Sequence, residues 1–153
     1  MTILSAADAA KVQTFFGEHM QDPVTIELFT EKKSMLYVPG RRDCETCAET
    51  EELLNEVAGL SDKITLVVNN VRESPESALA EGIAPNLLPA FVVKGAGRGK
   101  VRFFGVPGGY EFSSLIQDVV DVSGGVTRLN QTTKEELAKL EDDVHIRVFV
   151  TPT

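Results

Sequence analysis

The chain has 153 residues, of which 42% are hydrophobic and 25% charged, a composition that fits one folded domain and excludes a disordered or collagen-like chain. Its 15 Lys and Arg against 23 Asp and Glu give a formal net charge of −8, which disfavours binding to nucleic acid or to an anionic membrane. No apolar run approaches the roughly 18 residues that cross a bilayer, and residues 1–8 lack the features of a secretory signal, so we expect a cytoplasmic protein.

The first half of the chain predicts alternating helices and strands. Apolar residues spaced by three and four predict helices, β-branched runs predict strands, and Ser74-Pro75 is a helix start signal. The expected elements are a helix over 5–20, a strand over 24–30, a helix over 44–58, a strand over 64–68 and a short helix over 74–82. Residues 31–43, with a Pro39-Gly40 turn signal, form the polar connection before the second helix.

The next segment predicts an antiparallel pair and a closing helix. Residues 90–94 and 101–104 flank a glycine-rich stretch and indicate a β-hairpin. A helix is expected over 111–122, and Gly124-Gly125 ends it. Alternating elements followed by an antiparallel pair predict an α/β fold, a central mixed sheet with helices on both faces.

The remaining residues look like the opening of another unit. A helix is expected over about 133–141, capped by Thr132, and a strand over 145–150. Because these elements follow the Gly124-Gly125 break, we predict one domain over 1–125 and the beginning of a second unit over 126–153. On this interpretation the chain is a fragment of a longer protein.

The two cysteines, Cys44 and Cys47, stand three residues apart where a strand–loop–helix unit turns into its helix. Amide groups at a helix N-terminus favour an anion, so the first thiol ionises more easily, and Cys47 lies within reach to resolve a mixed disulfide formed at Cys44. Arg41 and Arg42 favour the thiolate, whereas the neighbouring acidic residues oppose it. We expect a modest lowering of the thiol pKa and a reducing pair.

Three other interpretations of the cysteine pair stay open. The two side chains can be small buried hydrophobes that happen to be close. They can be half of a zinc site, for which His19 and His145, far apart in sequence, are the available further ligands. Cysteines from two copies of the chain can also share a metal or an iron–sulfur cluster across a dimer. Within one chain, we expect no metal.

The order of elements resembles the thioredoxin fold: a strand, a CxxC pair opening a helix, a further strand and helix, and Leu88-Pro89 before a hairpin and a last helix. The stretch 101–112, Val-Arg-Phe-Phe-Gly-Val-Pro-Gly-Gly-Tyr-Glu-Phe, is similar to the hairpin-to-helix turn of the glutaredoxin-like protein disulfide oxidoreductases. That family carries two thioredoxin units in tandem. A related module forms the N-terminal domain of the flavoprotein component of bacterial alkyl hydroperoxide reductase.

This resemblance implies roles for particular residues. Cys44 is implied to be the nucleophile and Cys47 the resolving thiol, with Pro89 in the cis form beside them. The backbone of Leu88 is then free to pair with an extended substrate. Thioredoxins carry a buried acid in the strand before the motif, and Glu27 falls near that place, although an exposed strand glutamate is the competing interpretation.

The sequence departs from the family in the 13-residue connection between Thr30 and Cys44, which is longer than usual and carries Arg42, a further candidate for substrate binding. We expect a thiol–disulfide oxidoreductase that reduces or isomerises protein disulfides without a bound cofactor, because the dithiol itself cycles. A flavoprotein reductase or glutathione is the expected electron donor. The alternative is a relay or docking module for a flavoprotein reductase and peroxidase system, with little or no catalysis of its own.

Overall fold

The computed structural model describes residues 3–32, 43–84, 86–95, 99–125 and 127–149. Its elements, in chain order, are α1 (Ala6–His19), β1 (Val24–Thr30), α2 (Cys47–Ala58), β2 (Ile64–Asn70), α3 (Pro75–Ala80), β3 (Ala90–Lys94), β4 (Lys100–Phe104), α4 (Tyr110–Gly124) and α5 (Gln131–Leu137). The predictions for residues 33–42, in the connection over 31–43, and for 96–98 lie outside the described residues. Elsewhere up to residue 124 the predicted elements are present, with β2 two residues longer than expected.

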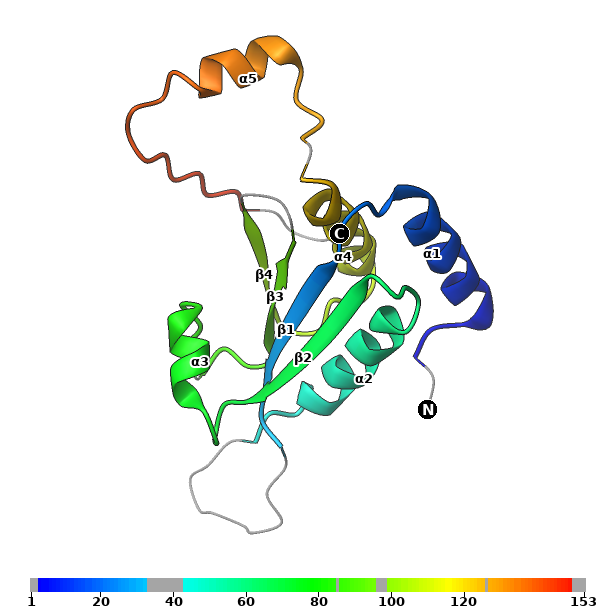
Figure 1. Cartoon of the computed structure of the whole chain (residues 1–153). Helices are drawn as coiled ribbons and strands as arrows, with labels where there is room; N and C mark the ends of the chain where they lie inside the picture. The colour runs from blue at the N-terminus through cyan, green and yellow to red at the C-terminus, as the bar shows by residue number, and fades with distance from the viewer. Residues whose placement is uncertain (1–2, 33–42, 85, 96–98, 126, 150–153) are drawn as a thin grey trace.

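The four strands form one mixed sheet in the order β2-β1-β3-β4 (Figure 1). β1 pairs in parallel with β2 and antiparallel with β3, and β3 pairs antiparallel with β4, with Phe29 opposite Ala90 and Phe91 opposite Phe103. The parallel pair needs a crossover, which α2 provides. The α/β prediction of a mixed sheet is confirmed.

Helices cover both faces of the sheet. The larger core joins one face of β1 and β3 to the apolar sides of α1, α2 and α4, and its members include Phe16, Leu28, Leu54 and Leu115. A smaller core lies between the other face and the segment around α3. Side chains alternate along β3, so that Phe91 and Val93 enter the larger core while Ala90 and Val92 enter the smaller one.

Two glycines are required by the packing of α4. A Cβ atom on Gly95, at the end of β3, would lie 2.6 Å from the carbonyl oxygen of Val122, so only glycine allows this close approach. Gly125 ends α4 in the left-handed conformation, with its amide bonded to the carbonyl of Asp121. The predicted glycine stop is therefore confirmed.

The C-terminal region differs from the prediction. α5 begins earlier than expected, because the side chain of Asn130, not Thr132, accepts the capping hydrogen bond from the amide of Thr133 at 2.8 Å. Residues 145–149 are described without strand structure, so the predicted strand is not formed there. A strand needs a paired neighbour, and Ile146, Val148 and Phe149 are 79%, 77% and 90% exposed. Figure 1 shows α5 standing away from the sheet, while the chain that follows α5 turns back toward the sheet.

Candidate functional site: the cysteine pair

The sequence places both cysteines where the chain enters α2, and the structure joins them in a disulfide with Cα atoms 5.5 Å apart. Cys47 is the first residue of α2 and is buried, 2% exposed, because its side chain turns toward the protein interior. Cys44 is only partly buried. The pair therefore joins a partly buried residue to a fully buried one, an asymmetry of the kind that thiol–disulfide exchange uses.

The predicted start of the helix at Cys44 is wrong by three residues. The first helical hydrogen bond of α2 runs from the amide of Thr50 to the carbonyl of Thr46, at 3.0 Å, so that Thr46 is the N-cap. The Thr50 hydroxyl donates to the same carbonyl at 2.9 Å. Cys44 therefore precedes the helix, while Cys47 occupies its first turn, next to the unpaired amides.

Leu88 and Pro89 lie at the end of the sheet where β1 ends and β3 begins. Pro89 immediately precedes Ala90, which pairs with Phe29 near the end of β1, and the chain leaves that same end toward Cys44. The Leu88–Pro89 peptide bond is cis, as the resemblance implies. Pro89 is buried and its carbonyl accepts from the amide of Gly105 at 2.8 Å, whereas Leu88 is partly buried. Arg42, the remaining substrate-binding candidate, lies outside the described residues.

Glu27 lies on the face of β1 that α3 covers, whereas α2 packs on the opposite face with Ile26 and Leu28. Its side chain is 26% exposed and its Oε2 atom lies 2.6 Å from Nζ of Lys94 on β3. Glu27 is therefore partly buried and paired with Lys94, rather than an exposed strand glutamate. The suggested proton-transfer role of Glu27 stays a prediction.

Lys94 also contacts Glu81, which follows α3. Glu81 contacts two further cationic side chains, both on β4. Its carboxylate lies 2.9 Å from Lys94, 2.5 Å from Lys100 and 4.0 Å from Arg102. The hydrogen bond from Lys100, and then that from Lys94, lowers the pKa of Glu81 below its ordinary value, against the effect of burial. Burial disfavours the charge of Lys94, but the hydrogen bonds to Glu27 and Glu81 outweigh it and raise its pKa.

We expect Glu81→Gln to reduce the stability lost on acidification. Because the folded-state pKa of Glu81 is lowered, its contribution is fully present above the unfolded value of 4.5 and disappears as the pH falls through the lower folded value. At neutral pH the variant should lose about 1 kcal/mol of unfolding free energy, and this difference should vanish in acid. Urea unfolding at both pH values measures it, with Glu141→Gln, an exposed carboxylate, as the control. An equal loss at both pH values would contradict the assignment.

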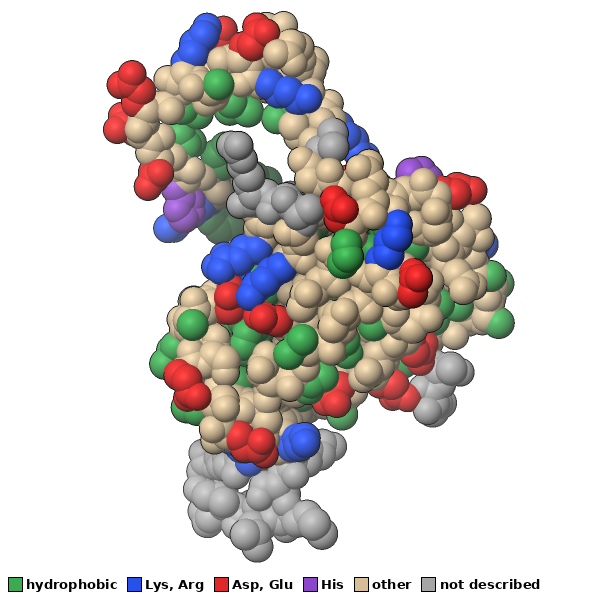
Figure 2. Space-filling view, in the orientation of Figure 1, with side chains coloured by type: hydrophobic (Ala, Val, Ile, Leu, Met, Phe, Trp, Pro, Cys, Tyr) green, Lys and Arg blue, Asp and Glu red, His purple; other side chains and the backbone are tan. Residues whose placement is uncertain are grey.

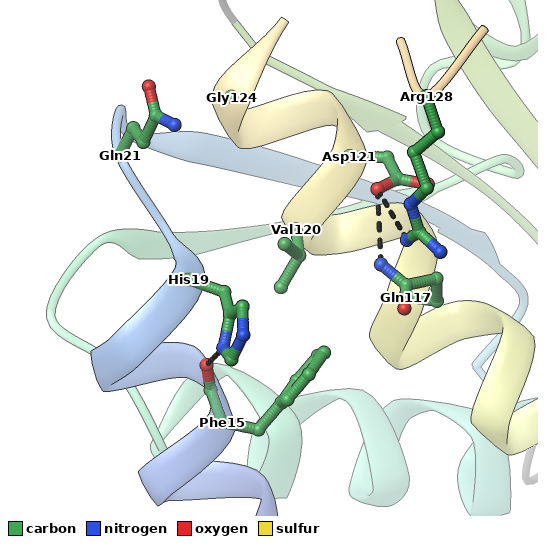
Figure 3. Close-up of a pocket in the computed structure, with 8 residues that line it drawn as sticks. All are labelled: Phe15, His19, Gln21, Gln117, Val120, Asp121, Gly124 and Arg128. Atoms are coloured by element: carbon green, nitrogen blue, oxygen red, sulfur yellow. Dashed lines mark hydrogen bonds and ion pairs between the residues drawn. The ribbon is translucent and has the colours of Figure 1, made fainter. Parts of the chain in front are cut away.

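A cavity of about 360 Å³ opens between α1 and α4, at the end of the sheet where β1 begins. Figure 3 shows the ring of His19 stacked on Phe15, and Asp121 bonded to both Gln117 and Arg128. The cysteines follow the other end of β1, so the cavity contains no predicted site residue apart from His19, which the zinc alternative named. It is separate from the disulfide.

Two further properties concern metal binding and membrane insertion. Among the described residues, His, Cys, Asp and Glu side chains form no group of three or more that is arranged to hold a metal ion. The helices in the described part of the chain are too short or too polar for any of them to span a bilayer.

Sequence reasoning missed Arg72, which contacts the residue directly before Cys44. Its guanidinium lies 3.3 Å from Oδ1 of Asp43 and also pairs with Glu31. No local pattern distinguishes this arginine, because its partners lie 41 and 29 residues away along the chain.

The amino-acid sequence is similar to that of AhpF, a component of alkyl hydroperoxide reductase, whereas no protein-family model matches the chain. The AhpF protein of Staphylococcus epidermidis is 30% identical over 106 residues, which are 69% of this chain and 18% of the relative. That of Staphylococcus aureus is 27% identical over 110 residues, 71% of this chain and 19% of the relative. The chain therefore spans less than a fifth of the length of these curated relatives.

Solved structures share the fold. AhpF of alkyl hydroperoxide reductase from Enterococcus faecalis aligns with a TM-score of 0.71 and 23% identity, over 90% of this chain and 61% of that chain. A protein disulfide oxidoreductase from Aeropyrum pernix aligns with a TM-score of 0.71 and 22% identity, over 89% of this chain and 55% of that one. The chain is a protein of thioredoxin-like fold and a homologue of part of AhpF.

Proposed function

We propose that the protein is a thiol–disulfide oxidoreductase that reduces or isomerises disulfides in protein substrates through Cys44 and Cys47. The observation that carries this proposal is the disulfide between a partly exposed Cys44 and a buried Cys47 at the first turn of α2. An oxidised pair at this position accepts two electrons and two protons to become a dithiol, and the dithiol returns them to a substrate.

The reaction has two steps. The Cys44 thiolate attacks one sulfur of a substrate disulfide, forming a mixed disulfide and releasing the other substrate sulfur as a thiolate, which takes up a proton. Cys47 then loses its proton and attacks the sulfur of Cys44, so the internal disulfide forms and the second substrate thiol leaves. Glutathione or a flavoprotein reductase restores the dithiol. The reaction needs no tightly bound cofactor, and we assign it to the reducing cytoplasm.

We propose that Leu88, Pro89 and Arg42 bind the substrate. The position of Leu88-Pro89 supports this proposal. These residues directly precede β3, whose first residue pairs with Phe29 near the end of β1, and the cysteine segment leaves the sheet from that same end. An extended substrate segment can pair with the backbone there and place its disulfide against Cys44.

A second candidate function is a relay or docking module for a flavoprotein reductase. The similarity to AhpF favours this alternative. We also propose that residues 126–153 begin a second unit after a domain over 1–125. The exposure of Ile146, Val148 and Phe149 supports this division, because an apolar extended segment is stabilised when a neighbouring strand or helix covers it.

Reduction of insulin disulfides, followed by precipitation of the freed B chain, tests the proposal. The full chain, supplied with glutathione and glutathione reductase, should accelerate precipitation well above the rate with glutathione alone. If the rate equals that background while the protein forms a measurable complex with a flavoprotein reductase, the docking function replaces the catalytic one. Coloured protein, or zinc bound to it as isolated, would support the metal alternative.

A further inference from the structure

A single side chain, Arg72, holds both ends of the connection that leads from β1 to the cysteine pair. Its Nε atom donates to the carboxylate of Glu31, the first residue after β1, and its Nη2 atom donates to Oδ1 of Asp43, the residue before Cys44, at 3.3 Å. The side chains of Arg72 and Glu31 are 26% and 19% exposed, so this contact is shielded more than a surface ion pair. The fork of a guanidinium suits such a bridge between two carboxylates.

The backbone around Arg72 is fixed by contacts that do not involve its side chain. Val71 is buried, and its amide donates to the carbonyl of Thr30 at the end of β1, at 3.0 Å. Asn70 accepts a hydrogen bond from the amide of Arg72 at 3.3 Å and donates to Glu73 at 2.8 Å. The guanidinium therefore extends from a well-bonded turn that lies against the end of β1.

The charges near Cys44 come from several elements. The carboxylates that precede it, follow it or contact its segment are Glu31, Asp43, Glu45 and Glu49. Each of them disfavours a thiolate, whereas the N-terminus of α2 and the guanidinium of Arg72 favour one. Arg41 and Arg42 precede Asp43 in the sequence and lie outside the described residues. Arg72 is thus a described cation that contacts the segment of Cys44, through Asp43.

We propose that Arg72 is a positioning residue for the thiol of Cys44, and this proposal deepens the function proposed above and rests on it. By pairing with Glu31 and Asp43 together, Arg72 fixes the backbone that leads into the cysteine pair. It also offsets the carboxylate adjacent to Cys44, so that reduced Cys44 is present as a thiolate to a greater extent at neutral pH.

The test measures the reactivity of the thiol rather than turnover. In a Cys47→Ser background, iodoacetamide labels Cys44 alone. Arg72→Gln should lower the labelling rate of the reduced protein at pH 7 by about threefold or more, and should move the pH profile of labelling to higher pH. Arg72→Lys keeps the charge but loses the fork, and should recover part of the rate. A purely structural role would not move the pH profile.

Two further variants make the test specific. Asp43→Asn, at a side chain that is 51% exposed, should raise the labelling rate and should shrink the effect of Arg72→Gln in the double variant. Arg128→Gln removes a more exposed ion pair, 3.0 Å from Asp121, at the far end of β1, and should leave the rate unchanged.

Either of two results overturns the proposal. One is a pH profile for Arg72→Gln that coincides with that of the parent protein; if that variant does not fold, the Asp43→Asn profile decides in its place. The other is an equal effect of Arg72→Gln with and without Asp43. Because labelling needs no substrate, a failure of insulin reduction would refute the oxidoreductase function without changing these outcomes.

Discussion

Replacing Cys44 by serine should abolish insulin-disulfide reduction, lowering the rate by about 100-fold or more to the background of glutathione alone. The physical reason is that a serine hydroxyl does not ionise near neutral pH and cannot form a disulfide, whereas Cys44 is the less buried residue of the pair. The measurement is the precipitation rate of reduced insulin at equal protein concentration. Circular dichroism of the variant checks that the fold is retained.

Cys47→Ser is the matched comparison, because it removes the other sulfur of the same disulfide. This variant should still attack a substrate but stall, so that a mixed disulfide with Cys44 accumulates and is visible on a non-reducing gel. If Cys44→Ser were as active as the native protein, the cysteine pair would not be the reaction centre. The docking function would then be the better account of the similarity to AhpF.

Phe91→Ala should lower the free energy of unfolding by about 3–5 kcal/mol. Phe91 is fully buried in β3, between the two neighbouring strands, and its ring stacks on Phe103 with centroids 4.8 Å apart. Truncation removes apolar burial and ring contacts and leaves a cavity that the rigid sheet can fill only in part. Because a domain of this size is marginally stable, the loss should be plain in urea unfolding.

Phe104→Ala provides the control, since Phe104 lies on adjacent β4 and is 50% exposed. Its loss should be below about 1 kcal/mol. Phe91→Leu, which keeps most of the volume, should cost less than Phe91→Ala. A loss below about 1 kcal/mol for Phe91→Ala would mean that the packing of the larger core is not as described.

The space-filling view shows charged side chains scattered over the visible surface, with Lys and Arg lying beside Asp and Glu (Figure 2). The ion pairs around Glu81 and Arg72 are examples of this intermixing. A net charge of −8 therefore coexists with local cations at the positions where carboxylates are partly buried. Composition predicts the overall charge, but the tertiary fold decides which carboxylates are compensated.

Local sequence was sufficient for most elements of the sheet and for the position of the cysteines. The β-branched run at 24–30 predicts β1 with its observed bounds, and the hairpin and the glycine end of α4 were also predicted correctly. Two errors, at the starts of α5 and α2, occurred where a competing local signal existed. Asn130 rather than Thr132 caps α5, and α2 begins at Cys47 because Thr46 supplies the first helical acceptor.

The predicted strand at 145–150 shows where periodicity is insufficient. Its residues have strong β propensity, but a strand forms only when a neighbour supplies the hydrogen bonds of a ladder. Within the described residues, 145–149 are not paired with the sheet. The residue pattern therefore indicates a segment that could pair as a strand, but it does not pair with β1–β4 in this structure.

The amino-acid pattern alone determined the alternation of helices and strands, the acidic balance and two cysteines three residues apart, because each depends on composition or on neighbours within a few residues. The three-dimensional packing decided that Leu88-Pro89 meets the end of β1, that Lys94 joins Glu27 to Glu81, and that Arg72 bridges Glu31 and Asp43. Such contacts join residues distant along the chain. They depend on strand register and on which side chains share a face, and a one-residue slip in register would separate them.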